Sequence, residues 1–135
     1  MINVVSGIML NGNAILACQR RQDQTLPLRW YLPGGKVEIG ESQRTALQRE
    51  LFEELGIYVS IKDISDVKVN FHIEYKHGMF NVNFYSVKEY KGVPVNKEHA
   101  NMKWIVNKGI DDYDWLEGDL LVAKLAFMER FGNGI

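Results

Sequence analysis

Acidic side chains crowd one stretch of the sequence, directly after two glycines. Residues 33–57 read PGGKVEIGESQRTALQRELFEELGI and contain five of the 17 acidic residues of the chain. Three of them, Glu50, Glu53 and Glu54, fall within about one turn of a helix. Like charges at this spacing cost free energy unless another group compensates them. Convergent carboxylates suit a hard cation such as Mg²⁺, so the stretch indicates either a metal site or a solvated helix face.

A helix is needed to hold these carboxylates on one side. Residues 42–55 are mostly good helix formers, with Ser42 as a candidate N-cap and Gly56 as a candidate C-terminal stop. The three carboxylates then span an arc of about 100°. The adjacent arc carries the apolar residues Leu47, Leu51 and Leu55. We therefore expect the carboxylates at the edge of the buried face of this helix.

Strand patterns occupy most of the remaining sequence. Apolar or alternating segments predict strands at 2–10, 14–19, 30–32, 67–75, 79–87 and 102–106, with turns at 11–13 and 77–78. An amphipathic helix is predicted at 119–131, with Leu121, Ala123, Leu125 and Phe127 to Met128 as its apolar residues. A loop is predicted at 20–29. A mixed sheet combined with two helices predicts an α/β sandwich. The length of 135 residues fits a single domain over 1–135.

Composition narrows the partners and the compartment. The chain is 46% hydrophobic and 24% charged with a formal net charge of −1, which is typical of a globular protein. Because no basic run of five residues occurs, we expect no long nucleic acid as partner. No apolar run approaches a membrane span, and the N-terminus lacks a signal-peptide pattern. Cys18 is the single cysteine, so we predict no disulfide framework and a cytoplasmic location.

The acidic stretch resembles the signature motif of the Nudix hydrolases, G-x5-E-x7-R-E-[aliphatic]-x-E-E-x-G-[aliphatic]. All nine specified positions match, at Gly35, Glu41, Arg49, Glu50, Leu51, Glu53, Glu54, Gly56 and Ile57. The chain is also similar to the smaller, MutT-like members over residues 2–131. That similarity includes the W-x-L-P-G-G sequence at 30–35, Glu98 six residues before Trp104, and the Gly118-Asp119 entry to the last helix.

The resemblance implies the Nudix α/β/α sandwich, with a mixed β-sheet between a catalytic helix and a C-terminal helix. It also implies hydrolysis of a nucleoside diphosphate linked to another moiety. A triphosphate brings about four negative charges, so a face of carboxylates must bind divalent cations to accept it. We expect Mg²⁺, with Mn²⁺ as a substitute. The implied ligands are the carbonyl of Gly35 and the carboxylates of Glu50, Glu53, Glu54 and Glu98.

Catalytic roles follow from the same resemblance. Glu53 is our preferred general base, which takes a proton from the attacking water. Glu98 is its rival because family members differ, although Glu98 is also interpretable as a solvated surface charge. Glu50 and Arg49 complete the candidate catalytic group. Arg49 is expected to pair with Glu41 and to fix the loop against the helix.

Four residues are candidate substrate contacts: Arg20, Gly34, Lys36 and Asp119. Arg20 and, less strongly, Lys36 can bind phosphate, although Arg20 is equally interpretable as an exposed arginine near Asp23. Gly34 permits close approach of the backbone. Asp119 is either the N-cap of the last helix or, by resemblance, the residue that reads the nucleobase. An ionised Asp only accepts hydrogen bonds, which suits guanine N1–H and N2–H₂ or the cytosine N4 amino group.

The other candidates give weaker signals. His72, His77 and His99 show no ligand spacing, so we predict surface or packing roles for them. Phe84 and Tyr85 are candidates for stacking on a base, without a choice between them.

The leading hypothesis is a Mg²⁺-dependent nucleoside triphosphate pyrophosphohydrolase. By resemblance, water attacks the β-phosphorus and releases the monophosphate and pyrophosphate, which clears damaged or surplus nucleotides. The base is guanine-like, as in 8-oxo-dGTP, or cytosine-like. One alternative is cleavage of another diphosphate link, as in ADP-ribose or a dinucleoside polyphosphate. The other is a nucleotide-sensing module without activity, which is less favoured because no motif carboxylate is missing. The sequence leaves a homodimer open.

Overall fold

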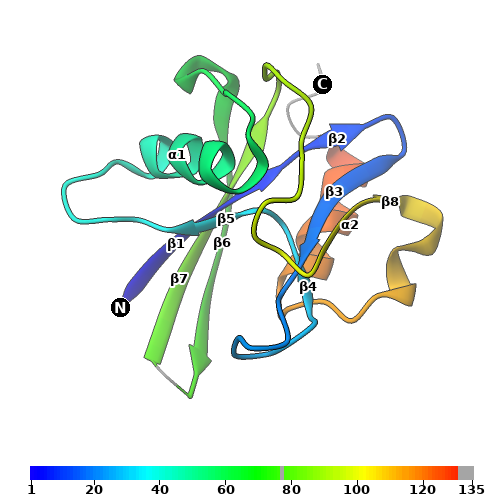
Figure 1. Cartoon of the computed structure of the whole chain (residues 1–135), viewed down its shortest axis with the longest axis horizontal. Helices are drawn as coiled ribbons and strands as arrows, with labels where there is room; N and C mark the ends of the chain where they lie inside the picture. The colour runs from blue at the N-terminus through cyan, green and yellow to red at the C-terminus, as the bar shows by residue number, and fades with distance from the viewer. Residues whose placement is uncertain (77, 131–135) are drawn as a thin grey trace.

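The computed structural model describes residues 1–76 and 78–130. Its strands are β1 (Ile2–Ile8), β2 (Leu10–Asn11), β3 (Ala14–Gln19), β4 (Trp30–Tyr31), β5 (Gly34–Lys36), β6 (Ile64–Tyr75), β7 (Gly78–Val87) and β8 (Asn101–Val106). Its helices are α1 (Gln43–Leu55) and α2 (Asp119–Glu129), with 3₁₀ turns at Ile61–Asp63 and Asn107–Asp112. Figure 1 shows their arrangement. Every predicted element is present, while β5 is an additional strand. The predicted turn residue His77 and the predicted helix end Phe131 lie outside the described residues.

The strands form two sheets rather than the single sheet that we expected. The first has the order β5-β1-β7-β6, and it is mixed because β1 runs parallel to β7. The second contains β2, β3 and β4, with β8 paired to β3. The predicted strand over 2–10 is divided at Met9, where the chain passes from the first sheet into the second. One continuous segment therefore connects the two sheets.

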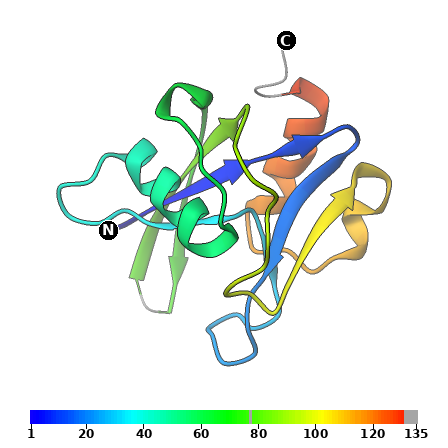
Figure 2. The ribbon, with the colours of Figure 1, turned by 45° about the horizontal axis from the view of Figure 1, so that its top comes forward.

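The two helices pack into two different parts of the core. Leu47, Leu51 and Leu55 of α1 are fully buried as predicted, in a cluster with Val5 and Tyr85. Helix α2 belongs to a second cluster, which contains Phe84 and Ile105. Figures 1 and 2 show α1 and α2 on opposite sides of the strands, which confirms the α/β/α sandwich.

The buried face of α2 differs from the one that we predicted. Leu121 and Met128 were assigned to the apolar face, but they are 51% and 74% exposed. The residues that pack inward are Val122, Ala123 and Ala126. Ala123 is therefore buried as predicted, and the partly buried Leu120 and Phe127 pack against the same cluster.

Both ends of α1 have the caps that the sequence predicted. Ser42 Oγ accepts the backbone N–H of Thr45 at 3.1 Å, which satisfies one donor of the first turn. Gly56 adopts a left-handed conformation with φ of 70°, and its N–H donates to the carbonyl of Phe52. The cap at Gly56 therefore ends α1 at Leu55, directly after the segment that carries Glu50, Glu53 and Glu54.

The segment between β7 and β8, residues 88–100, runs past the C-terminal end of α1 (Figure 1). The N–H of Val95 donates to the carbonyl of Leu55 at 3.0 Å, and the N–H of Lys97 donates to the carbonyl of Glu54 at 3.2 Å. These two bonds fix the segment to the last turn of α1. They bring residues 98 and 99 next to the glutamates of that turn.

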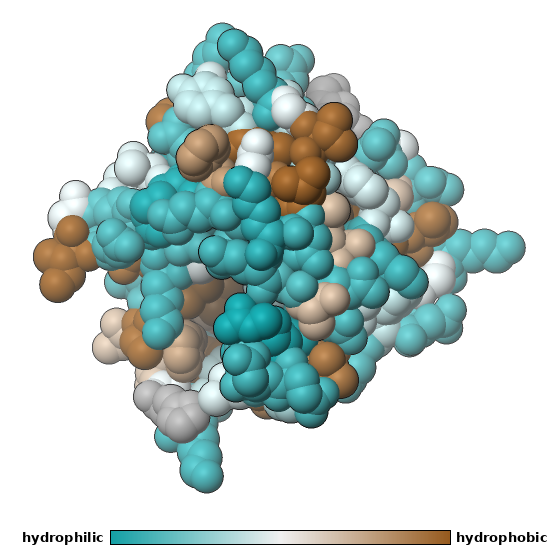
Figure 3. Space-filling model, in the orientation of Figure 1, coloured by the Kyte–Doolittle hydropathy of each residue, from teal (hydrophilic) through white to brown (hydrophobic). Residues whose placement is uncertain are grey.

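The face that carries α1 is largely hydrophilic, with separate apolar groups (Figure 3). Within residues 1–76 and 78–130, no helix is long and apolar enough to cross a membrane.

Candidate active site

The side chains of Glu50, Glu53 and Glu54, here called the acidic cluster, lie together near the end of α1. Their side-chain exposures are 14%, 50% and 11%, respectively. The cluster therefore sits at the edge of the buried face, as predicted, with Glu53 as its solvent-facing member.

Arg49 joins the cluster to the loop that precedes α1. Its Nε donates to Glu41 Oε2 at 2.7 Å and its Nη2 donates to Glu41 Oε1 at 2.9 Å. This bidentate pair confirms the predicted contact between Arg49 and Glu41. Nη2 also donates to the carbonyl of Lys36 at 3.0 Å. The hydrogen bonds from Arg49 lower the pKa of Glu41 to about 2.

The same guanidinium also neutralises two members of the acidic cluster. Arg49 Nη1 donates to Glu50 Oε1 at 2.9 Å and to Glu53 Oε2 at 3.3 Å. In this arrangement, no three His, Cys, Asp or Glu side chains of the described residues converge as a set of metal ligands. The like-charge cost is therefore met in part by Arg49, and a divalent cation would compete with Arg49 for the same oxygens.

Burial raises the pKa of both Glu50 and Glu54. The pKa of each is raised from 4.5 to about 7, with desolvation as the largest cause. Interaction with Glu54 further raises the pKa of Glu50, whereas interaction with Glu50 lowers that of Glu54. Two adjacent, desolvated carboxylates cannot both ionise at low cost, so protonation of one of them is favoured as the pH falls towards neutral.

The residues of the acidic cluster fit a hard divalent cation. Their donors are all oxygens, which such cations prefer. Gly35 contributes space, because a Cβ atom at this position would lie 2.4 Å from Glu50 Cδ. Glu54 Oε1 is buried and has no aligned hydrogen-bond donor within residues 1–76 and 78–130. The charge of this carboxylate is therefore incompletely compensated by those residues, and a cation at its other oxygen would compensate it.

Glu98 lies close enough to influence the cluster. It is an exposed loop residue, as predicted, and its charge raises the pKa of Glu54. Its backbone carbonyl accepts a hydrogen bond from Arg21 Nη1 at 2.9 Å. The loop thus holds Glu98 within electrostatic range of Glu54, and its role as ligand or base stays a prediction.

His99 is the site residue that the sequence did not identify. Its side chain is only 4% exposed, and Nε2 lies 3.0 Å from Glu54 Oε1. Nδ1 lies 3.0 Å from the hydroxyl of Tyr31, and desolvation lowers the pKa of the ring. A surface role for His99 is therefore excluded and its burial against Tyr31 agrees with a packing role, but the contact with Glu54 was not predicted. His72 is exposed as expected. Only the passage of 88–100 across α1 reveals the contact, since His99 lies 45 positions from Glu54 in the chain.

The candidate phosphate-binding residues differ in their surroundings. Arg20 Nε donates to the carbonyl of Thr25 at 2.6 Å and Nη2 to Thr25 Oγ1 at 3.0 Å. Its neighbour Arg21, rather than Arg20, pairs with Asp23. Lys36 is exposed at the end of β5. Arg20 would have to exchange a bond to its own loop for a phosphate, whereas Lys36 is exposed to solvent.

Gly34 allows two strands to meet closely. A Cβ atom at this position would lie 1.9 Å from the carbonyl oxygen of Val5 in the adjacent strand β1. Any larger residue would separate β5 from β1 and displace the neighbouring Gly35.

Asp119, the first residue of α2, is enclosed where this helix packs against residues 30–32. The residue is 6% exposed, and its Oδ2 accepts the N–H of Leu32 at 2.8 Å. The alternative that Asp119 caps α2 is wrong, because Gly118 is the N-cap and the Asp119 side chain makes no capping bond. Desolvation raises the pKa of Asp119 from 3.8 to about 7, and the bond from Leu32 opposes this shift. The protonated and the ionised forms of Asp119 are therefore both populated near neutral pH.

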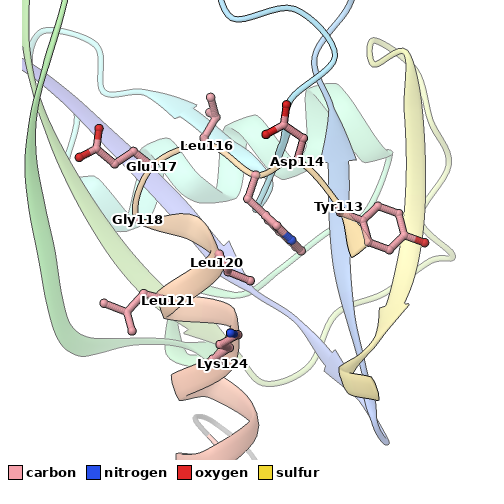
Figure 4. Close-up of a pocket in the computed structure, with 9 residues that line it drawn as sticks. Tyr113, Asp114, Leu116, Glu117, Gly118, Leu120, Leu121 and Lys124 are labelled. Atoms are coloured by element: carbon pink, nitrogen blue, oxygen red, sulfur yellow. The ribbon is translucent and has the colours of Figure 1, made fainter. Parts of the chain in front are cut away.

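The other candidates have simple structural explanations. Phe84 and Tyr85 are 1% and 5% exposed and belong to the core, so neither offers a free face to a base. Figure 4 shows an open pocket between residues 113–118 and the first turns of α2. No member of the acidic cluster lines this pocket, so it lies apart from the candidate metal site.

Comparison with known proteins agrees with this geometry. Residues 2–124 match the family model described as NUDIX domain. The chain therefore belongs to the Nudix family, whose hydrolases generally use divalent metal ions.

Relatives and solved structures extend the match over nearly the whole chain. The chain is 37% identical over 131 residues to the "Putative 8-oxo-dGTP diphosphatase 2" of Mycobacterium tuberculosis, which covers 97% of the chain and 90% of that protein. It is 34% identical over 128 residues to the CTP pyrophosphohydrolase of Escherichia coli, at 95% and 92% coverage. The solution structure of the E. coli ORF135 protein has a TM-score of 0.78 at 31% identity, covering 96% of this chain and 89% of that chain. These comparisons confirm the MutT-like character of the fold.

Proposed function

We propose that the chain is a Mg²⁺-dependent nucleoside triphosphate pyrophosphohydrolase that acts on damaged or surplus nucleotides. The observation that carries the proposal is the acidic cluster, held against Gly35 and braced by the bidentate pair of Arg49 and Glu41. Similarity to relatives named as 8-oxo-dGTP diphosphatase and CTP pyrophosphohydrolase supports the same reaction class.

In this proposal the acidic cluster, together with the carbonyl of Gly35 and the loop residue Glu98, holds the divalent cation. Mg²⁺ supplies charge neutralisation for the phosphates and activation of water, and Mn²⁺ is expected to substitute for it. Arg49 would give up its bonds to Glu50 and Glu53 to such a cation and would keep its two bonds to Glu41, so the loop would remain fixed to α1.

Glu53 is the member of the cluster best suited to accept a proton. It is half exposed, so its carboxylate reaches the solvent from which the attacking water comes. Glu50 and Glu54 are more enclosed and are better suited to hold the cation. Water then attacks the β-phosphorus while Glu53 takes its proton. The bond from this phosphorus to the oxygen that bridges to the α-phosphate breaks, so the nucleoside monophosphate leaves with that oxygen and the added hydroxyl stays on pyrophosphate.

We assign base recognition to Asp119 and phosphate contacts to Arg20, Lys36 and the backbone at Gly34. With a pKa of about 7, Asp119 can accept one hydrogen bond as a carboxylate or donate one as an acid. This range of hydrogen bonding is compatible with guanine-like or cytosine-like bases. We further propose a cytoplasmic location, supported by one buried, unpaired cysteine, and domain bounds of 1–135; a homodimer stays a prediction.

A substrate panel tests the proposal. Purified protein with Mg²⁺ is incubated with 8-oxo-dGTP, dGTP, CTP, dCTP, ADP-ribose and a dinucleoside tetraphosphate, and the products are identified by mass. We expect a monophosphate and pyrophosphate from at least one of the triphosphates. Turnover of ADP-ribose or the dinucleotide alone would instead assign another diphosphate link. Tight nucleotide binding without any product would assign a sensing module.

A further inference from the structure

His99 reaches the acidic cluster from a segment that is anchored independently of it. The backbone bonds from Val95 and Lys97 to the last carbonyls of α1 hold the segment in place. The side chain of Asn96 adds two more bonds, because its Nδ2 donates to the carbonyl of His99 and its Oδ1 accepts the N–H of His99, both at 2.9 Å. The backbone of His99 is therefore fixed, and its ring enters the cluster from a defined direction.

Both nitrogens of the His99 ring face polar atoms. Nδ1 lies 3.0 Å from the hydroxyl of Tyr31, and Nε2 lies 3.0 Å from Glu54 Oε1. The ring also contacts Tyr31 edge to face, with centroids 5.7 Å apart. Nε2 and Oε1 are both buried and have no other hydrogen-bond partner within residues 1–76 and 78–130. Their approach is close, although the angle falls short of an aligned hydrogen bond.

Only one arrangement of protons makes both contacts favourable for a neutral ring and an ionised Glu54. If Nδ1 carried the proton, the lone pair of Nε2 would face the carboxylate of Glu54. If Nε2 carries the proton, a positive N–H dipole lies 3.0 Å from Glu54 Oε1, and Nδ1 accepts the hydroxyl proton of Tyr31. Burial raises the pKa of Tyr31, so its hydroxyl keeps this proton. The hydroxyl of Tyr31 thus supports the ring tautomer that an ionised Glu54 favours, by donating to Nδ1.

We propose that His99 is a positioning residue for the metal site, which holds the carboxylate of Glu54 through Nε2–H and is itself set by the hydroxyl of Tyr31. The inference rests on the proposed function in one respect, namely that Glu54 is a ligand of the divalent cation. A donor on one oxygen fixes the rotation of the carboxylate and leaves the other oxygen to the cation. Outer partners of this kind orient metal ligands in many proteins.

Mn²⁺ binding tests the proposal without relying on turnover. Free Mn²⁺ is measured by electron paramagnetic resonance during titration of the wild type, His99→Leu, His99→Gln and Tyr31→Phe. We expect His99→Leu to weaken binding about 10- to 100-fold. His99→Gln keeps an N–H donor near the position of Nε2 and should recover part of the loss. Tyr31→Phe should weaken binding by a smaller factor, because the ring loses the hydroxyl that sets its tautomer.

A double-mutant comparison shows whether His99 acts through Glu54. We expect His99→Leu to have less than about a twofold effect in a Glu54→Gln background, because the carboxylate that it positions is gone. The matched control is His72→Leu, which replaces an exposed histidine of β6 and should leave the affinity unchanged. Circular dichroism in EDTA checks folding. If His99→Leu does not fold, His99→Gln and Tyr31→Phe carry the test, alone and in the same background.

Two results overturn the inference. One is wild-type Mn²⁺ affinity in the His99 and Tyr31 variants, and the other is an equal loss with and without Glu54. Either leaves the proposed function standing, since the wild type still binds Mn²⁺ and releases pyrophosphate. A wild type that binds no Mn²⁺ overturns the metal site and the positioning role together.

Discussion

The chain buries carboxyl groups in two regions, the end of α1 and the start of α2, and it compensates them differently. At α1, Glu50 and Glu54 lie among other charges, with Arg49 donating to Glu50 and with Glu53 open to solvent. At α2, Asp119 is nearly fully enclosed, and one backbone N–H, from Leu32, donates to its Oδ2. The pKa of all three buried groups is raised to about 7.

The raised pKa values in the two regions therefore have different consequences for what each region can bind. Desolvation is the largest cause in both regions, but at α1 the charges of neighbouring carboxyl groups add to it, so a cation can compensate the pair there. Asp119 is raised by desolvation without such a neighbour, so a proton or a hydrogen-bond donor of a ligand can satisfy it. We therefore expect both regions to respond to pH, the α1 region to respond also to metal, and the α2 region also to the nucleobase.

The largest expected effect is on kcat in a variant of the α1 region, which distinguishes catalysis at α1 from base recognition at α2. Glu53→Gln should lower kcat at least about a hundredfold, because it removes the proposed proton acceptor. KM should change much less, since the recognition region is untouched. Steady-state kinetics on the preferred triphosphate measure both constants. The control is Glu38→Gln, which alters a 69% exposed side chain whose ion pair to Arg49 is long, at 3.8 Å. An unchanged kcat in Glu53→Gln would transfer the role of base to another carboxylate, with Glu98 as the first candidate.

The next effect concerns the space that glycine leaves at α1. Gly35→Ala places a Cβ atom about where the Glu50 carboxylate now lies, so Glu50 must move and Mn²⁺ affinity should fall about tenfold or more. Titration calorimetry measures the affinity. Gly109→Ala is a matched control, because its added Cβ would meet Asp112 Oδ2 at an ordinary 3.6 Å. If both variants bind Mn²⁺ equally well, the close approach of Glu50 to Gly35 is not required for the metal site.

Asp119→Asn should change base selection but not metal binding. The amide keeps an acceptor for the N–H of Leu32, but it cannot ionise. We expect the ratio of kcat/KM between the preferred and the other triphosphates to shift about tenfold, because the hydrogen bonds to the base are mismatched. Mn²⁺ affinity should stay within about twofold of wild type. A variant with unchanged selectivity would leave base recognition to other residues.

The smallest effect is the dependence of folding stability on pH. Both regions contribute to it, and Mg²⁺ and a substitution at Asp119 distinguish their contributions. The raised pKa of Asp119 means that the folded state binds more protons than the unfolded state between about pH 4 and pH 7. Stability of the metal-free protein should therefore fall as pH rises through this window. Raised pKa values at Glu50 and Glu54 act in the same direction.

Thermal melts at pH 5 and pH 8, with EDTA or with Mg²⁺, measure these contributions, and 1 kcal/mol corresponds to about 4 °C for a domain of this size. Mg²⁺ should recover part of the loss at pH 8 in wild type. Asp119→Asn should lose less stability than wild type between the two pH values. Equal losses of stability in wild type and Asp119→Asn would show that Asp119 does not contribute to the pH dependence.

Much of the fold and of the α1 region could be predicted from sequence, because the determinants are local. Ser42 and Gly56 cap α1 where their residue types suggested, and the resemblance to the Nudix motif predicted the pairing of Arg49 with Glu41. The division of the strands into two sheets was not predictable in this way. It depends on Met9, where the chain changes partners, and no local pattern marks that position.

The sequence by itself determined the family motif, the acidic cluster and the helix that carries it, because a helix converts spacing along the chain into position in space. The tertiary structure alone decided that His99 contacts Glu54 and that Asp119 turns inward to Leu32 rather than capping α2. Both contacts join residues far apart in the chain, through the crossing of residues 88–100 over α1 and the packing of α2 against residues 30–32. Burial and pairing of this kind are properties of the assembled core, so they set the pKa values and the hydrogen bonds only after the sheets and helices have met.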